Sequence, residues 1–164
     1  PSPSSPSGRL WGLWEHEVVE VFISGPEESY LELEFGPFGH YLALGFRGRR
    51  QLVTEDYQIN ALSFWRDRKG ARSPQGEQER PNRGQRLFWG AHCELNLSTL
   101  PPPYRAQPSG WGVNAFWCFD SIKTESARFY CCASPLPGSS PNFHQPQYFP
   151  KWSPEGLSDT LYQS

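Results

Sequence analysis

The sequence predicts an all-β protein, built as an antiparallel two-sheet β-sandwich. Apolar and polar residues alternate with a period of two in successive short segments, a pattern typical of strands with one buried face. Turns containing glycine or proline separate these segments, and no segment has the period of an amphipathic helix. Aromatic residues make up 15% of the chain, so large rings are available to fill a core between two sheets.

The first strands are predicted between residues 17 and 60. Residues 17–24 (EVVEVFIS) end at the turn GPEE. Residues 29–36 (SYLELEFG) and 40–46 (HYLALGF) are separated by GPFG, whose glycines can adopt positive φ. This spacing predicts an antiparallel meander, and residues 51–59 predict a further edge strand.

The second half of the chain contains three more predicted strands, at residues 86–97, 110–121 and 126–134. Residues 66–86 have no period, which predicts a long mobile loop insertion. Seven basic and three acidic residues give this loop a net charge of +4, although the whole chain has −2. Because no aromatic residue interrupts these charges, we expect no nucleic-acid binding. Residues 135–156 lack a period but contain four large aromatic residues, so we expect these rings to lie on the sheet.

A single domain is predicted over residues 10–153. Residues 1–9 are rich in proline and serine and are predicted to be disordered, and residues 154–164 are predicted as a C-terminal tail. The chain contains no methionine, so we expect a fragment that lacks its N-terminal strands and exposes an unpaired sheet edge. No secretory signal and no membrane-spanning run is visible, and we expect no membrane partner.

The four cysteines have no CxxC spacing, so zinc is not indicated. Cys131 and Cys132 are neighbours, and the sequence predicts free, mostly buried thiols in a reducing compartment, which favours the cytoplasm. A disulfide between Cys93 and Cys118 is the alternative.

Three glutamates interrupt the first two strands. Because side chains alternate along a strand, Glu20 lies on one face of its strand and Val19 and Val21 lie on the other. In the next strand, Glu32 and Glu34 lie together on one face. If the apolar faces form the core, the glutamates share the outer face of the sheet, with Trp14 at its edge. This face is either solvated or a shallow cleft with an aromatic wall, which suits a sugar ring and its hydroxyl groups.

Catalytic motifs are absent from the sequence. There is no GxSxG nucleophile elbow, no glycine loop before a helix, and no pair of histidines at a metal-ligand spacing. Paired glutamates could indicate a glycosidase, but carboxylates at i and i+2 on an exposed face are poor candidates for widely separated pKa values. We therefore expect no enzyme activity, no cofactor and no metal.

Five motifs resemble uncharacterised protein family 462, in the order LWEHEVVEVFI, YLELEFGPFGHYLAL, GRR, LPPPY and PNFHQPQYF. The resemblance extends from about Leu13 to Trp152. Members of this family have no established activity. They begin earlier, with further β-structure, which implies that N-terminal strands are missing here.

A more remote resemblance is to family 9 carbohydrate-binding modules and DOMON-like β-sandwiches. It rests on Trp14 and the strand after it, and on an aromatic pattern at Phe143 near the C-terminus. The resemblance implies that these two rings clamp a sugar and that Glu20 contacts it. Phe143 stands where those modules carry tryptophan, and Glu32 and Glu34 stand where they carry basic or amide groups.

These observations give one prediction and one alternative for function. The prediction is a non-catalytic, carbohydrate-binding-like module with a glycan as partner, whose ligand-binding residues are Trp14, Glu20, Glu32, Glu34 and Phe143. The alternative is a protein-interaction or structural β-sandwich that binds no sugar.

Overall fold

A computed structural model describes residues 6–25, 27–57, 59–69, 86–95, 111–120, 127–139 and 141–152. The described chain consists of strands, turns and two single-turn 3-10 helices, η1 (Leu13–Glu15) and η3 (Pro146–Tyr148), so the all-β prediction is confirmed. No helix in these ranges is long and apolar enough to cross a membrane. The predicted C-terminal tail and most of the predicted disordered segment lie outside the described residues.

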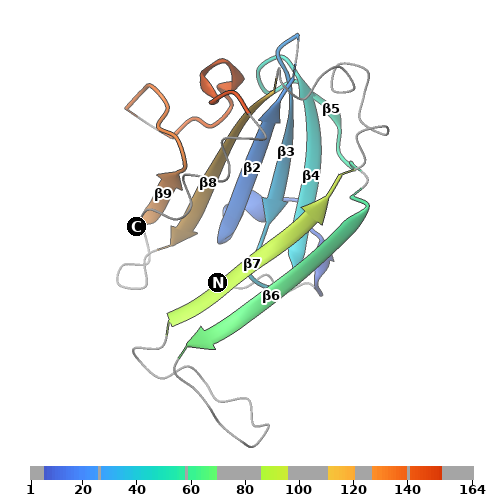
Figure 1. Cartoon of the computed structure of the whole chain (residues 1–164), viewed down its shortest axis with the longest axis vertical. Helices are drawn as coiled ribbons and strands as arrows, with labels where there is room; N and C mark the ends of the chain where they lie inside the picture. The colour runs from blue at the N-terminus through green and yellow to red at the C-terminus, as the bar shows by residue number, and fades with distance from the viewer. Residues whose placement is uncertain are drawn as a thin grey trace, which may run out of the picture.

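The larger sheet contains seven strands in the order β1-β4-β3-β2-β8-β9, with β5 also paired to β4 (Figure 1). These strands are β1 (Gly8–Arg9), β2 (Val18–Ser24), β3 (Ser29–Phe35), β4 (His40–Arg47), β5 (Leu52–Thr54), β8 (Gly112–Asp120) and β9 (Arg128–Cys132). The predicted antiparallel meander is confirmed, because β2, β3 and β4 pair in that order through short turns. The predicted edge strand is confirmed as the short β5.

The strand β1 corrects two predictions. It pairs with β4 in parallel, so the sheet is mixed and not wholly antiparallel. Its two residues, Gly8 and Arg9, lie within the segment predicted to be disordered. They are held there by backbone hydrogen bonds, such as the one that the Gly8 N–H donates to the Gly39 carbonyl at 3.1 Å.

The second sheet is a hairpin of β6 (Ala61–Lys69) and β7 (Arg86–Glu94). Figure 1 shows this hairpin crossing in front of the larger sheet. The predicted loop insertion therefore begins later than expected, because residues 66–69 belong to β6; residues 70–85 lie outside the described residues. The end of β6 is rich in charged residues, so the sequence there does not show the apolar–polar alternation of a strand. Arg66 nevertheless occupies a regular position, with its guanidinium 4.5 Å from the centre of the Phe38 ring.

Apolar side chains fill the space between the hairpin and the larger sheet. Leu62 and Phe64 of β6 pack with Leu33 and Phe35 of β3 in one core cluster, and the Phe35 and Phe64 ring centres are 6.5 Å apart. The Trp89 indole N–H also donates a hydrogen bond to Glu17 Oε1 at 3.2 Å. These contacts fix the hairpin against the sheet face that alternation predicted to be the core.

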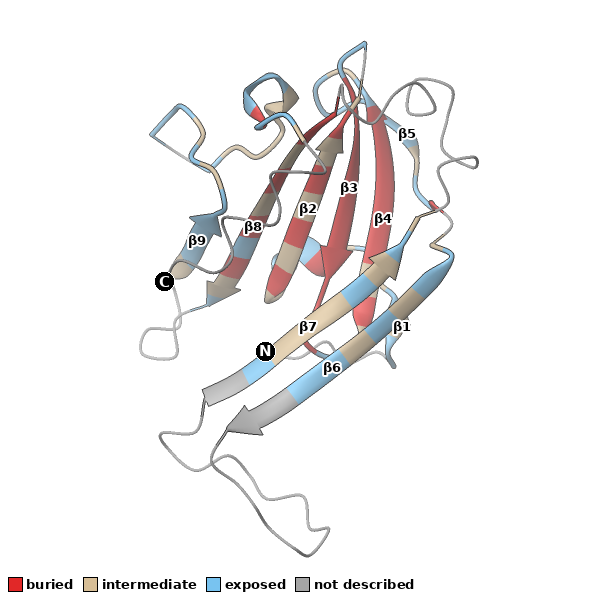
Figure 2. Ribbon diagram, viewed as in Figure 1, coloured by how far each residue is buried: buried red, intermediate tan, exposed pale blue. Residues whose placement is uncertain are grey.

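The opposite face of the sheet is also buried, which overturns the prediction that the glutamates lie on an outer face, outside the core. Glu20, Glu32 and Glu34 are 5%, 4% and 0% exposed, and Figure 2 shows β3 buried along its whole length. The cause is a second apolar cluster on this face, in which Phe149 and Phe143 from the C-terminal segment cover residues of the sheet. The expectation that the aromatic residues of this segment lie on the sheet is met by these two rings.

All four cysteines are free. Cys93 packs with the hairpin cluster and Cys118 with the cluster on the opposite face, so the alternative of a bridge between them is wrong in this structure. Cys118 is buried, but Cys131 and Cys132 are exposed on β9, which corrects the expectation of mostly buried thiols.

Candidate functional site

A cleft of about 480 Å³ opens on the sheet face that carries the glutamates, a volume within the usual range for small-molecule sites. Its floor is formed by strands β2, β3, β4 and β8. One wall comes from the N-terminal turn η1 and the other from β9 and the C-terminal segment. The lining residues are Trp11, Trp14, Glu20, Glu32, Leu44, Phe46, Arg50, Leu52, Cys118, Arg128, Tyr130, Pro141, Phe143 and His144.

The N-terminal wall is a pair of tryptophans. Trp11 and Trp14 meet edge to face, with ring centres 5.1 Å apart and planes at 82°. Gly12 between them has a φ of 82°, a left-handed conformation that suits glycine and turns the chain into η1. The two rings remain 51% and 37% exposed. Large apolar surface is therefore available to a ligand at this wall.

The opposite wall is more firmly packed. Phe143 stacks on Phe116 of β8 with ring centres 4.1 Å apart and planes at 13°, and it meets Tyr130 of β9 edge to face at 5.9 Å. One side of Phe143 therefore belongs to the core, while its rim lines the cleft.

The carboxyl groups lie side by side on adjacent strands. Glu20 is directly opposite Glu34 in the β2–β3 register, and Glu32 is opposite Phe22. The Cys118 thiol donates a long hydrogen bond to Glu20 Oε1 at 3.7 Å. Within the described residues, Oε2 of Glu32 and both carboxyl oxygens of Glu34 have no hydrogen-bonding partner. Such groups are costly to bury when charged.

Burial raises the pKa of all three glutamates. The pKa of Glu20 is raised to about 7, that of Glu32 to about 8 and that of Glu34 to about 9. Burial is the largest cause in each case, and repulsion from the neighbouring carboxyl groups adds to it for Glu32 and Glu34. At neutral pH Glu32 and Glu34 are therefore mainly protonated, and Glu20 is about half protonated.

His144 does not supply a positive charge that balances these carboxyl groups. Burial, followed by the nearby charges of Arg50 and Arg49, lowers its pKa to about 4. Its Nδ1 is 4.0 Å from Glu32 Oε2, but the imidazole and the acid are both mainly neutral near pH 7 and do not form an ion pair. Instead, a hydrogen bond of 2.8 Å joins this Nδ1 to the Tyr30 hydroxyl, which accepts another from the Arg50 backbone N–H at 3.0 Å.

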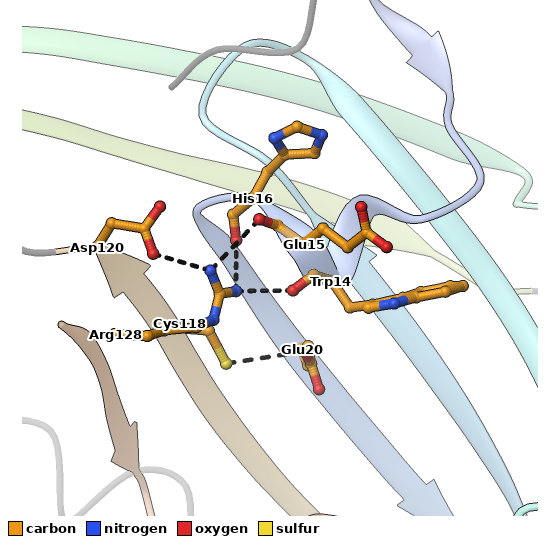
Figure 3. A network of polar contacts seen from close by, with 7 residues as sticks. All are labelled: Trp14, Glu15, His16, Glu20, Cys118, Asp120 and Arg128. Atoms are coloured by element: carbon orange, nitrogen blue, oxygen red, sulfur yellow. Dashed lines mark hydrogen bonds and ion pairs between the residues drawn. The ribbon is translucent and has the colours of Figure 1, made fainter. Parts of the chain in front are cut away.

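Arg128 fixes the tryptophan wall to the edge of the sheet (Figure 3). Its Nη2 donates to the carbonyl oxygens of Trp14 and His16, both at 2.7 Å, and its Nη1 donates to Asp120 Oδ1 at 3.1 Å. A weaker contact joins Nη1 to the Glu15 carbonyl at 3.4 Å. One guanidinium thus satisfies carbonyl groups around η1 and holds Trp14 over the cleft.

We expect Arg128→Ala to release η1 and to destabilise the fold by about 2–4 kcal/mol, because several charge-assisted hydrogen bonds are lost together. Arg128→Lys is expected to recover only part of this loss, since an ammonium cannot reproduce the planar fork. Urea unfolding measures the loss of stability, and the change in total tryptophan fluorescence reports the release of η1. An unchanged midpoint in Arg128→Ala would contradict the role of this residue.

Four of the five ligand-binding residues predicted from the sequence line the same cleft: Trp14, Glu20, Glu32 and Phe143. Glu34 does not, because it is wholly buried beneath the cleft. Sequence reasoning missed Trp11, Arg128 and His144. Trp11 carried a usable signal, since WGLW places two tryptophans three residues apart. Arg128 carried none, because nothing in a strand sequence indicates which distant carbonyl groups its first residue contacts.

Comparison with known proteins reveals similar proteins of unassigned function. The mouse protein named UPF0462 protein C4orf33 homolog is 28% identical over 161 residues, which cover 93% of this chain and 69% of that protein. The rat homologue is 29% identical, with 93% and 67% covered, and human UPF0462 protein C4orf33 is 29% identical, with 91% and 65% covered. These similarities support the resemblance to an uncharacterised family.

The comparisons do not extend beyond these names. No protein-family model matches the chain, and no solved structure matches it. The more remote resemblance to carbohydrate-binding modules therefore receives no support from them.

Proposed function

We propose that this chain is a non-catalytic saccharide-binding module and that its two sheets form a β-sandwich of the carbohydrate-binding-module type. The observation that carries the proposal is the convergence of Trp14 and Phe143, from opposite ends of the chain, on one cleft with Glu20 and Glu32 on its floor. A sugar presents apolar C–H faces to aromatic rings and hydroxyl groups to carboxyl groups.

The protonation of the floor favours a polyol. A protonated carboxyl group donates one hydrogen bond and accepts others, which matches a hydroxyl group that does the same. The unpartnered Oε2 of Glu32 offers one such position to a ligand. A hydroxyl group placed there would supply the missing hydrogen bond of a buried oxygen.

The direction of the pKa shifts supports a role without catalysis. A glycosidase needs one carboxyl group that is protonated and a second that is ionised. Here burial raises the pKa of both Glu20 and Glu32, so neither carboxyl group is held fully ionised at neutral pH, as the nucleophile of a glycosidase would be. Burial also raises the pKa of the Cys118 thiol to about 12, which removes a cysteine nucleophile from the cleft.

The proposal is tested by applying the protein to a glycan array and titrating the retained saccharides by calorimetry. Trp14→Ala is expected to weaken binding by about 5–30-fold, because an aromatic platform contributes about 1–2 kcal/mol. Stability should change little, since the Trp14 ring is partly exposed and contacts the exposed Trp11 ring. The saccharides should be recovered intact.

Phe143→Ala is the matched comparison, because it removes the other aromatic wall. This variant should lose stability as well as affinity, since Phe143 stacks on the buried Phe116. Retention of no saccharide by the wild-type protein, or unchanged affinity in Trp14→Ala, would contradict the proposed site. Hydrolysed saccharides would contradict the absence of catalysis.

One observation favours the alternative of a protein-interaction module. Trp117, Phe119 and Phe129 form a row of rings on β8 and β9, with centres 4.3 Å and 5.5 Å apart, and Trp117 and Phe129 are exposed. Exposed apolar patches of this kind often mark interaction sites. If the array retains no saccharide, this row becomes the better candidate for a binding surface.

A further inference from the structure

We propose that the saccharide bound in this cleft carries a basic amine, so that the ligand is an amino sugar whose ammonium group sits at the carboxyl floor. This inference rests on the proposed saccharide-binding function and names the class of saccharide. It comes from three features of the cleft: carboxyl oxygens without hydrogen-bonding partners among the described residues, cations of the cleft wall that are directed elsewhere or lie at its mouth, and aromatic faces beside the carboxyl groups.

The first feature is the density of carboxyl groups. Glu20, Glu32 and Glu34 project from the same face of two adjacent strands, where opposite side chains are about 5 Å apart and diagonal ones about 7–8 Å. All three are at least nine-tenths buried, and Glu32 lines the cleft with an oxygen that has no partner among the described residues. A cluster of this kind repels itself when ionised, so an added cation would be favoured there.

The second feature is the surrounding charge. The titratable or charged groups that face the carboxyl cluster are Tyr30 on β3, Cys118 on β8, Arg128 on β9, Arg50 after β4, and His144 in the C-terminal segment. Arg128 directs its guanidinium to Asp120 and to carbonyl oxygens. Arg50 is exposed at the mouth of the cleft, and its attraction for Glu32 is the weakest of the three influences on the pKa of that carboxyl group. Among the residues that the structure describes, the floor thus contains no cation whose main partner is Glu32.

The third feature is the pair of tryptophans. An ammonium group is attracted to the face of an aromatic ring, most strongly to tryptophan, and Trp11 and Trp14 line the same cleft as Glu20 and Glu32. An amino sugar can place its ring on the indole and its ammonium at the carboxyl group, whereas a neutral sugar can stack in the same way but offers the carboxyl group only hydrogen bonds. A divalent metal ion is a weaker alternative, because the described residues contain no group of three ligands arranged to hold one.

The experiment compares three tetrasaccharides that differ in one substituent. Titration at about pH 6, where the sugar amine is already an ammonium and Glu32 is still protonated, uses the glucosamine tetramer with free amines, its N-acetylated counterpart and the glucose tetramer, each in buffers of different ionisation enthalpy. The free-amine tetramer should bind at least about tenfold more tightly than the other two. Its apparent enthalpy should vary with the buffer, because charging a carboxyl group on binding releases a proton, while the enthalpies of the neutral tetramers should not.

Glu32→Gln should abolish the preference for the amine, because an amide cannot become an anion, so all three tetramers should then bind this variant with similar affinity. Glu94→Gln on β7 is the control, because this side chain is exposed and lies on the hairpin. Equal binding of all three tetramers would overturn the amine inference while the saccharide-binding proposal stands. Binding of none of the tetramers would overturn both the amine inference and the saccharide-binding proposal. A preference for the amine that survives in Glu32→Gln would show that the ammonium group does not bind at Glu32.

Discussion

Thermal unfolding of this protein should shift to lower temperature as the pH rises from about 5 to about 9. The folded-state pKa values of Glu20, Glu32 and Glu34 are raised from 4.5 to about 7, 8 and 9. Between these limits the folded protein holds protons that the unfolded chain has released. The resulting stability is fully present below the unfolded pKa and is lost as the pH passes through the folded values.

The expected loss is several kcal/mol, because each unit of pKa difference corresponds to about 1.4 kcal/mol. This is a large part of the roughly 5–15 kcal/mol by which small domains are stable. His144 acts in the opposite direction. Its folded pKa is lowered from 6.5 to about 4, so its contribution is present above pH 6.5 and is lost as the pH falls toward 4. The combined effect of the three glutamates is larger than that of His144. The free energy of unfolding should therefore be greatest near pH 5.

Melting curves recorded by circular dichroism across this pH range test the prediction. Glu34→Gln should flatten the dependence and should be more stable than the wild-type protein at alkaline pH, because an amide has no charge to bury. Glu94→Gln, whose carboxyl group is exposed, should follow the wild-type curve. A melting temperature that stays level or increases from pH 5 to 8 would show that the glutamates are hydrated and charged in the folded protein.

The sequence was sufficient to predict most strands and the face on which each residue lies. Strict alternation in β2 and β3 places Glu20, Glu32 and Glu34 on one side of the sheet, and the register confirms it. The link between Trp14 and Phe143 came from the resemblance to carbohydrate-binding modules, and both residues line one cleft. Local pattern and motif therefore located most of the candidate site.

The burial of that site could not be predicted in the same way. Alternation separates two faces but does not say whether the polar face is covered, and the covering segment at residues 141–149 has no period. Phe22 carried a partial signal, because a large apolar ring beside Glu20 is costly to leave in water. The parallel pairing of β1 and the contacts of Arg128 are tertiary features that leave no local pattern.

Phe22→Ala is expected to destabilise the protein by about 3–5 kcal/mol, the usual cost of deleting a fully buried phenylalanine. The Phe22 ring is 0% exposed and lies between the sheet and the C-terminal segment. Its centre is 5.4 Å from the Phe116 ring, 5.8 Å from the Phe149 ring and 5.5 Å from the His144 ring. Its removal leaves a cavity beneath the segment that carries one wall of the cleft.

The same substitution should therefore weaken ligand binding, although Phe22 does not line the cleft. Urea unfolding measures the first effect, and titration with the saccharide retained on the array measures the second under conditions where the variant remains folded. Val53→Ala is the control, since this side chain is exposed on β5 and should change neither quantity. A loss below about 1 kcal/mol in Phe22→Ala would mean that the C-terminal segment does not cover the sheet. The glutamates would then face water, as their alternation with apolar residues first suggested.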